Sequence, residues 1–371
     1  MKHRYTLAAL AALALAGLLP AEAARYWLAS DVVKNTTPSN ARGYANTLTL
    51  TSDDPENDPV SPIVITDVRQ IDNAGTSRQL RKIARDNGTA PFAGCAYGGV
   101  DLDLTLPIRD AEGNEFTLVE LANESFQDNL YIGSVKFPAS LTTIGQYSFR
   151  RCYYLREFTF PADTSALTNI GNAVFDNCSQ LKFAEWPTTV GVLPGWTFNG
   201  ATGLIGFYGA SVTNVGEAAF NTCTSLKTVE FGKGIEFTAR NVCQNVDRNT
   251  RQKIFFRTGA PVVNVHFTGY DGTSGTEGNT VFDWLSFGGV DFYIPLNATG
   301  DGPTAEWEKF KSDFLANEAN TTYENTVEWP TDNGDGTWTP GVIKSGRQGG
   351  RTGAIYYWDP SESTTAALLA Y

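Results

Sequence analysis

The sequence predicts a β-rich repeat solenoid, in which short repeats coil and their strands stack into a parallel sheet. Three observations support this fold class: a recurring phenylalanine, a small residue (usually Cys) three positions after it, and a short apolar strand that follows. The phenylalanines are 23, 26, 23 and 22 residues apart; they are Phe126, Phe149, Phe175, Phe198 and Phe220. A period in the low twenties, with units too short to bury a core alone, is typical of stacked repeats.

The best two units share nearly every position. Leu141–Pro161 reads LTTIGQYSFRRCYYLREFTFP, and Leu167–Pro187 reads LTNIGNAVFDNCSQLKFAEWP. Both resemble the BspA-like leucine-rich repeat of bacterial surface proteins, whose pattern is LxxIGxxAFxxCxxLxxVxFP. The Phe220 unit also fits, with Gly232 replacing the closing proline. The resemblance implies a right-handed leucine-rich repeat solenoid in a secreted or cell-surface protein whose repeats bind host proteins or other cells.

The resemblance is specific over residues 116–232 and weaker around them. Ala201 and Asn129 stand at the Cys position of two units. Degenerate units around Phe92 and Phe282–Leu285 extend the predicted solenoid to residues 62–297.

The N-terminal region predicts export. Residues 1–23 contain a basic start, the apolar run Leu7–Leu19 and an Ala-x-Ala site, which is the pattern of a secretory signal peptide. Residues 24–61 hold one β-like run and an acidic, proline-rich stretch. We expect this segment to cap the first coil, because solenoid ends expose apolar surface.

The C-terminal region, residues 298–371, is expected to close the array with a cap helix and a Gly/Thr-rich tail. A helix is predicted over 303–319, because Trp307, Phe310 and Phe314 share one face and Thr304 could cap its start. The tail predicts a hairpin around Asp335-Gly336.

Strand alternation selects the candidate ligand-binding residues. Side chains alternate between the two faces of a strand, so polar residues flanking the apolar ones are expected outward, in columns across the sheet. The candidates are Arg156, Glu157, Thr159, Lys182, Phe183, Glu185, Lys227, Thr228 and Glu230. Exposed positions are also expected for Tyr153 and Tyr154. The Gly of each Ile-Gly step is expected to form a tight turn with positive φ.

Four of the five cysteines, Cys95, Cys152, Cys178 and Cys223, lie three residues after a phenylalanine anchor. This interior position favours buried free thiols over a disulfide framework. A bridge between Cys152 and Cys178, in adjacent coils, stays open as an alternative.

No catalytic residue, metal site or cofactor is assigned, and the chain is not expected to be an enzyme. Beyond the predicted signal peptide there is one histidine, His266, in the apolar stretch Val262–Phe267, where a structural role is favoured. Asp332–Gly336 faintly resembles a calcium loop but lacks the later Glu, so a turn is favoured.

The net charge of −12 argues against nucleic acid as a partner. No further long apolar segment follows the signal peptide, so no transmembrane segment is expected in the mature chain. Three hypotheses follow: a secreted or cell-surface protein that binds an extracellular protein through the sheet, a glycan-binding or glycan-active protein with the repeats as scaffold, and a structural envelope component.

Overall fold

The computed structural model describes residues 25–30, 44–53, 64–72, 79–83, 92, 95–232, 236–237, 252–257, 260, 290–315, 326–344 and 352–360. The predictions for the signal peptide, His266 and the Phe282–Leu285 unit lie outside the described residues, as does the fifth cysteine, Cys243. Among the described residues, no helix is long and apolar enough to cross a membrane.

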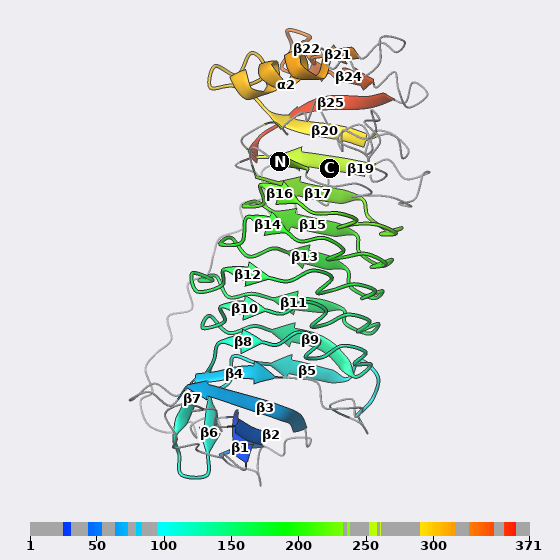
Figure 1. Cartoon of the computed structure of the whole chain (residues 1–371). Helices are drawn as coiled ribbons and strands as arrows, with labels where there is room; N and C mark the ends of the chain where they lie inside the picture. Colours follow the sequence, from blue (N-terminus) through cyan, green and yellow to red (C-terminus); the bar gives the residue numbers. More distant parts are fainter. Residues whose placement is uncertain are drawn as a thin grey trace, which may run out of the picture.

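The N-terminal end is an antiparallel sheet (Figure 1). Its strands are β1 (Arg25–Ser30), β2 (Tyr44–Ser52), β3 (Val64–Asp72) and β4 (Gln79–Ile83), each antiparallel to the next. The hairpin of β6 (Ile108–Asp110) and β7 (Glu115–Leu118) joins it, with β6 parallel to β1 and β7 parallel to β4.

The repeat array has two walls. The long wall stacks β5 (Val100–Asp103), β9 (Ile132–Lys136), β11 (Glu157–Thr159), β13 (Phe183–Glu185), β15 (Gly206–Gly209), β17 (Thr228–Phe231), β19 (Gln252–Phe256), β20 (Val290–Pro295) and β25 (Thr352–Trp358) (Figure 1). The short wall stacks β4, β8 (Glu120–Leu121), β10 (Thr143–Ile144) and β12 (Asn169–Ile170), then β14 (Val192–Leu193), β16 (Asn214–Val215) and β18 (Glu236–Phe237). All pairings within each wall are parallel, which confirms the predicted β-rich parallel repeat architecture.

The strand nearest the predicted boundary at residue 62 is paired as the N-terminal strands are. β3, which begins two residues later, pairs antiparallel with both neighbours, so it belongs to the N-terminal sheet. Parallel stacking begins with β4, which lies beside β8. The reason is the hairpin connection: a short link returns the chain antiparallel, whereas a parallel neighbour needs a full coil in between. The division of the chain into domains otherwise stays a prediction.

The C-terminal end closes over the last strands. Helix α2 (Ala305–Leu315) buries Trp307, Phe310 and Phe314, and Trp307 packs against Phe256 at 5.0 Å. The backbone carbonyl of Thr304 accepts hydrogen bonds from the amides of Trp307 and Glu308, whereas its hydroxyl is buried and has no partner among the described residues. β21 (Thr326–Glu328) and β24 (Gly341–Lys344) extend the sheet from β25, and β22 (Thr331–Asp332) and β23 (Trp338–Thr339) form the hairpin predicted around Asp335-Gly336.

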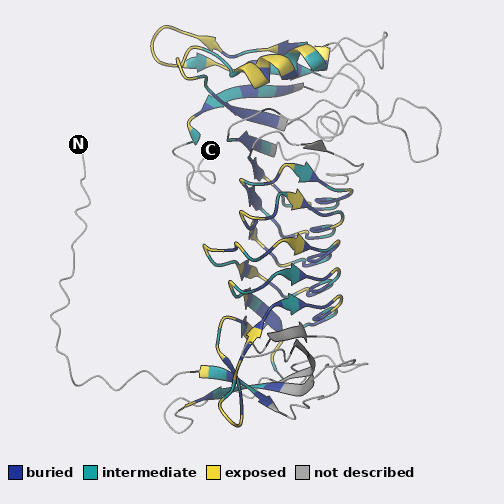
Figure 2. Ribbon diagram, turned by 60° about the vertical axis from the view of Figure 1, so that its left-hand side comes forward, coloured by how far each residue is buried: buried dark blue, intermediate teal, exposed yellow. Residues whose placement is uncertain are grey.

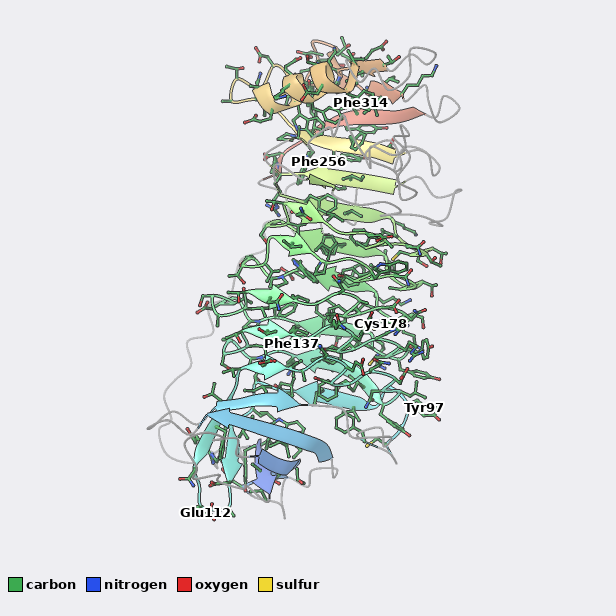
Figure 3. All side chains as sticks on the ribbon, viewed as in Figure 1. Tyr97, Glu112, Phe137, Cys178, Phe256 and Phe314 are labelled. Carbon is green, nitrogen blue, oxygen red and sulfur yellow. The ribbon has the colours of Figure 1, made fainter. Side chains whose placement is uncertain are left out.

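The core is a continuous file of phenylalanine rings. Neighbouring anchors stack at centroid distances of 5.2 to 6.4 Å from coil to coil; the file is Phe92, Phe126, Phe149, Phe175, Phe198 and Phe220. Phe137 lies inside the stack between the walls (Figure 3) and meets Phe149 edge-on at 5.7 Å. Each ring inside the file contacts the anchors of the coils before and after it, so the repeats share one core.

The Ile-Gly glycines have a different role from the predicted one. Gly145, Gly171 and Gly216 do not adopt positive φ, so the tight-turn prediction is wrong. A Cβ at any of them would lie closer than 3.0 Å to backbone atoms of the preceding coil. They are needed for close backbone approach between coils.

Positive φ falls instead on residues two before and two after each anchor, for example Tyr147 and Arg151 around Phe149. Their amides bond to the next coil's carbonyls, as in Tyr147 N–H to Asn172 O (3.0 Å) and Arg151 N–H to Asp176 O (2.7 Å).

The cysteine prediction is confirmed for the described residues. Cys152, Cys178 and Cys223 are buried free thiols, and Cys95 is free and half-buried. Each buried thiol donates to the carbonyl of the previous anchor, as Cys178 Sγ does to Phe149 O at 3.2 Å. Burial raises the pKa of all three thiols.

Candidate binding surface

The outward positions of the long wall form two columns. The inward side chains of its strands, such as Phe158, Ala184 and Val229, join the main core, so the residues that alternate with them face outward. The first column is Asp101, Ser134, Glu157, Phe183, Gly206, Thr228, Lys253, Asp291 and Ala354. The second is Asp103, Lys136, Thr159, Glu185, Tyr208, Glu230, Phe255, Tyr293 and Tyr356. We call these two columns the outer face.

On β5, β9, β11 and β13 the outer face is polar. Glu157, Thr159 and Glu185 are exposed, as is the ring of Phe183 with 38% of its area accessible. In the first coils, Ser134 Oγ donates to Asp101 at 2.7 Å, and Lys136 Nζ lies 3.1 Å from Asp103. Partial burial opposes ionisation of Asp103, but hydrogen bonds from Thr105 and Lys136 outweigh it and lower its pKa.

On β15 to β25 the same columns are largely buried, and the second column is aromatic except at Glu230. Tyr208, Phe255, Tyr293 and Trp358 form their own cluster outside the main core (Figure 2 shows burial by residue). Phe255 stacks on Tyr293 at 4.3 Å and meets Trp358 edge-on at 5.1 Å. This part of the wall is a second, outer core.

Two predicted site residues lie in this outer core and are corrected. Thr228 and Glu230 were expected outward and accessible, but only 4% and 2% of their areas are exposed. Glu230 lies between Tyr208 and Phe255 in register, and its carboxylate accepts a hydrogen bond from Arg257 Nε. Burial raises the pKa of Glu230, although the Arg257 guanidinium opposes the shift. Glu230 is therefore a buried ion-pair partner of Arg257. Strand alternation determines which way its side chain points, but not what covers it.

Tyr208 marks the border between the two parts. Its hydroxyl is buried and has no hydrogen-bond partner among the described residues, and a Cβ on Gly206 would lie 2.8 Å from it. Burial, with the nearby Glu230 carboxylate, raises the pKa of Tyr208 to about 12. The hydroxyl is therefore neutral at physiological pH.

The remaining predicted residues stay accessible. Arg156, Lys182 and Lys227 are exposed, each one residue after the buried leucine of its coil. The backbone places them in one line, because Lys182 N–H bonds to Arg156 O (3.2 Å) and Lys227 N–H to Ile205 O (2.9 Å), with Ile205 N–H bonded to Lys182 O (2.8 Å). We call Arg156, Lys182 and Lys227 the basic column. It runs along the side of the outer face where the strands begin.

Sequence reasoning missed a tyrosine cluster at the start of this line. Tyr97 lies 5.4 Å from Tyr154 in a stacked arrangement and 5.6 Å from Tyr131, and 59% of its area is exposed at the edge of the wall (Figure 3). Of the tyrosines expected to be exposed, Tyr153 is and Tyr154 is half-buried. The signal that could have found the cluster is the tyrosine immediately before the strand leucine or isoleucine in two successive coils, at Tyr131 and Tyr154.

Among the described residues, no group of three or more His, Cys, Asp or Glu side chains could hold a metal ion. Asp332 and Asp335 instead accept backbone amides of their own loop, from Gly334 (2.8 Å) and Thr337 (2.9 Å). The loop Asp332–Gly336 therefore has the turn that the sequence favours.

Residues 119–249 match the model of the BspA-type leucine-rich repeat region, in six copies. Two solved structures that match part of the chain are a leucine-rich repeat protein of T. pallidum (22% identity, 49% of this chain and 78% of that one, TM-score 0.37) and a leucine-rich cell surface protein of Faecalibacterium prausnitzii (18% identity, 54% and 56%, TM-score 0.36). A third is the pneumococcal vaccine antigen PcpA (10% identity, 66% and 94%, TM-score 0.18). No curated protein matches the chain.

Proposed function

We propose that this chain, which carries six BspA-type leucine-rich repeats, is a secreted or cell-surface protein that binds an extracellular protein through the exposed part of its outer face. Leucine-rich repeats of this family suggest a protein-binding surface. The adhesive, non-catalytic role and the location outside the cell are our proposal.

The observation that carries the proposal is the accessibility of one half of the long wall. Glu157, Thr159, Phe183 and Glu185 stand in stacked columns on adjacent coils of the long wall, flanked by the basic column. Stacked repeats present extended surfaces of this kind to partners. A rigid backbone beneath the contact side chains lowers the entropic cost of binding.

The test is capture of purified extracellular-matrix proteins and glycans by the purified chain. A face variant replaces Arg156, Glu157, Lys182, Glu185 and Lys227 with Ser. Glu230 is left in place, because it is buried and its replacement would remove the ion-pair partner of Arg257. A control variant carries exposed changes away from the face: Gln146→Ser, Asn169→Ser, Asn172→Ser and Glu217→Ser.

We expect saturable binding of a protein by the native chain and the control, and its loss in the face variant with unchanged thermal unfolding. Binding that survives in the face variant would place the site elsewhere. Retention of glycans alone would favour a glycan-binding protein instead.

A further inference from the structure

The basic column differs from other basic residues of the repeats in having no acidic partner. Residues 95–232 contain seven Lys and Arg side chains. Four of them pair with carboxylates: Arg109 with Glu115, Lys136 with Asp103, Arg150 with Asp176 and Arg151 with Asp128. The other three are Arg156, Lys182 and Lys227, and none has a carboxylate partner among the described residues.

The basic column and the tyrosine cluster of Tyr97, Tyr131 and Tyr154 form one continuous strip. The Arg156 guanidinium donates to Gly98 O at 2.9 Å, the residue next to Tyr97, and a Cβ on Gly98 would lie 3.1 Å from Tyr154 Cβ. Arg156 therefore lies against the tyrosines, while Lys182 and Lys227 continue the line away from them. Successive strands are about 4.8 Å apart, so the three coil steps from Arg156 to Lys227 span about 14 Å.

The two ends of this strip have different chemistry. The Tyr97 ring, stacked on Tyr154, is a rigid and exposed aromatic surface, and tyrosine and arginine are enriched among residues that dominate protein interfaces. The other end offers two unpaired ammonium groups. On a chain of net charge −12, this is a local cationic line beside the acidic Glu157 and Glu185.

We infer that the strip binds an extended acidic segment of a partner protein, with an apolar or aromatic side chain on Tyr97 and carboxylates along Arg156, Lys182 and Lys227. About 14 Å corresponds to about four extended residues at about 3.3 Å each. Glu157 and Glu185 repel the segment from the middle of the sheet and hold it to the side where the strands begin. The inference rests on the proposed function and specifies the partner's chemistry.

The probes are three fluorescein-labelled peptides: one tryptophan followed by a glycine and about five glutamates, the same peptide with lysines for glutamates, and the glutamate peptide with glycine for tryptophan. A sulfated polysaccharide, heparin, is the fourth probe. Binding to the full chain is followed by fluorescence anisotropy at low and physiological salt. The tryptophan–glutamate peptide should bind saturably and weaken as salt rises, and the lysine peptide should not bind.

The decisive variant is Arg156→Ser, Lys182→Ser and Lys227→Ser together, which should weaken the tryptophan–glutamate peptide about tenfold or more. Its matched control removes the same charge from the C-terminal region: Lys309→Ser, Lys311→Ser and Lys344→Ser. The control should bind as the native chain does. Tyr97→Ala should weaken the tryptophan–glutamate peptide and leave the peptide without tryptophan unchanged.

Several results would overturn the inference: no saturable binding of the acidic peptide, equal loss in the control variant, or binding of heparin alone. The last would make the partner an anionic polysaccharide. A matrix protein that the native chain captures and the face variant loses, while no peptide binds, would leave the proposed function standing without this partner chemistry. If the chain captures no matrix protein and binds no peptide, both the proposed function and the inferred partner chemistry are contradicted.

Discussion

The outer faces of β11 and β13 are exposed, whereas those of β17 and β19 are largely buried, although all four strands occupy the same wall. Glu157 and Glu185 meet solvent, while Glu230, at the column position of Glu185, is sealed between Tyr208 and Phe255. The backbone register is the same in both regions. The difference teaches that a repeat fixes the direction of a side chain, while its neighbours decide whether it meets solvent, a partner or a core.

The largest expected effect separates the two regions directly. Phe255→Ala should destabilise the protein by about 3–4 kcal/mol, because a fully buried ring stacked on Tyr293 leaves a cavity. Phe183→Ala, on the exposed region, should cost no more than about 0.5 kcal/mol. Urea denaturation of both variants checks the contrast, and equal costs would contradict the existence of an outer core.

A second comparison tests whether neighbouring coils are equally closely spaced in the two regions. Gly171→Ala and Gly216→Ala should each cost about 2–3 kcal/mol, because the new Cβ overlaps backbone atoms of the preceding coil. Gly191→Ala is the control, since its nearest neighbour would be Thr213 Oγ1 at 3.4 Å. Thermal unfolding should show two similar losses and no loss in the control. Unequal losses would mean that coil spacing differs between the regions.

Glu230 and Glu185 occupy the same column, but only Glu230 is buried. We therefore expect the two carboxylates to contribute differently to the pH dependence of stability. Burial raises the folded-state pKa of Glu230 above its ordinary value of 4.5. The folded protein then holds this proton more tightly than the unfolded chain does, so its contribution favours folding below pH 4.5 and is lost as pH rises through the raised pKa.

Glu230→Gln should remove that part of the pH profile of unfolding midpoints, and Glu185→Gln should only reduce it, because the Glu185 carboxylate is a smaller cause of the raised Glu230 pKa. Identical profiles for native protein and the Glu230 variant would show that the carboxylate is not buried in solution.

The smallest expected difference concerns the thiols. Cys178 lies in the region with the exposed face and Cys223 in the region with the buried one, and both are fully buried. Both should resist a thiol-modifying reagent in native conditions and react on unfolding, because burial raises their pKa and blocks access. Faster native labelling of either one would show that its coil opens locally, and mass spectrometry of the labelled peptides would identify which.

The repeat itself could be predicted from the sequence, and so could most of its inside. The period of the anchors, the apolar residues between polar ones and the small residue after each anchor determined the stacked Phe149, Phe175 and Phe198 rings, the buried thiols and the parallel sheet. These are local and periodic properties, since each coil repeats the same contacts with its neighbours. Seven of the nine candidate face residues were also placed correctly as exposed, which is a statement of position and not of binding.

Only the tertiary structure decided what covers each face and what meets at its edges. Thr228 and Glu230 follow the same alternation as Glu157, but both are buried, and Glu230 lies between the aromatic residues Tyr208 and Phe255 of the neighbouring strands. The tyrosine cluster joins Tyr97 to Tyr154, 57 residues later in the chain, and no local pattern encodes that contact. The glycines of the Ile-Gly steps are required by the approach of the preceding coil rather than by their own φ. Periodicity specifies direction within a coil, whereas burial, pairing and clustering depend on side chains that other coils supply.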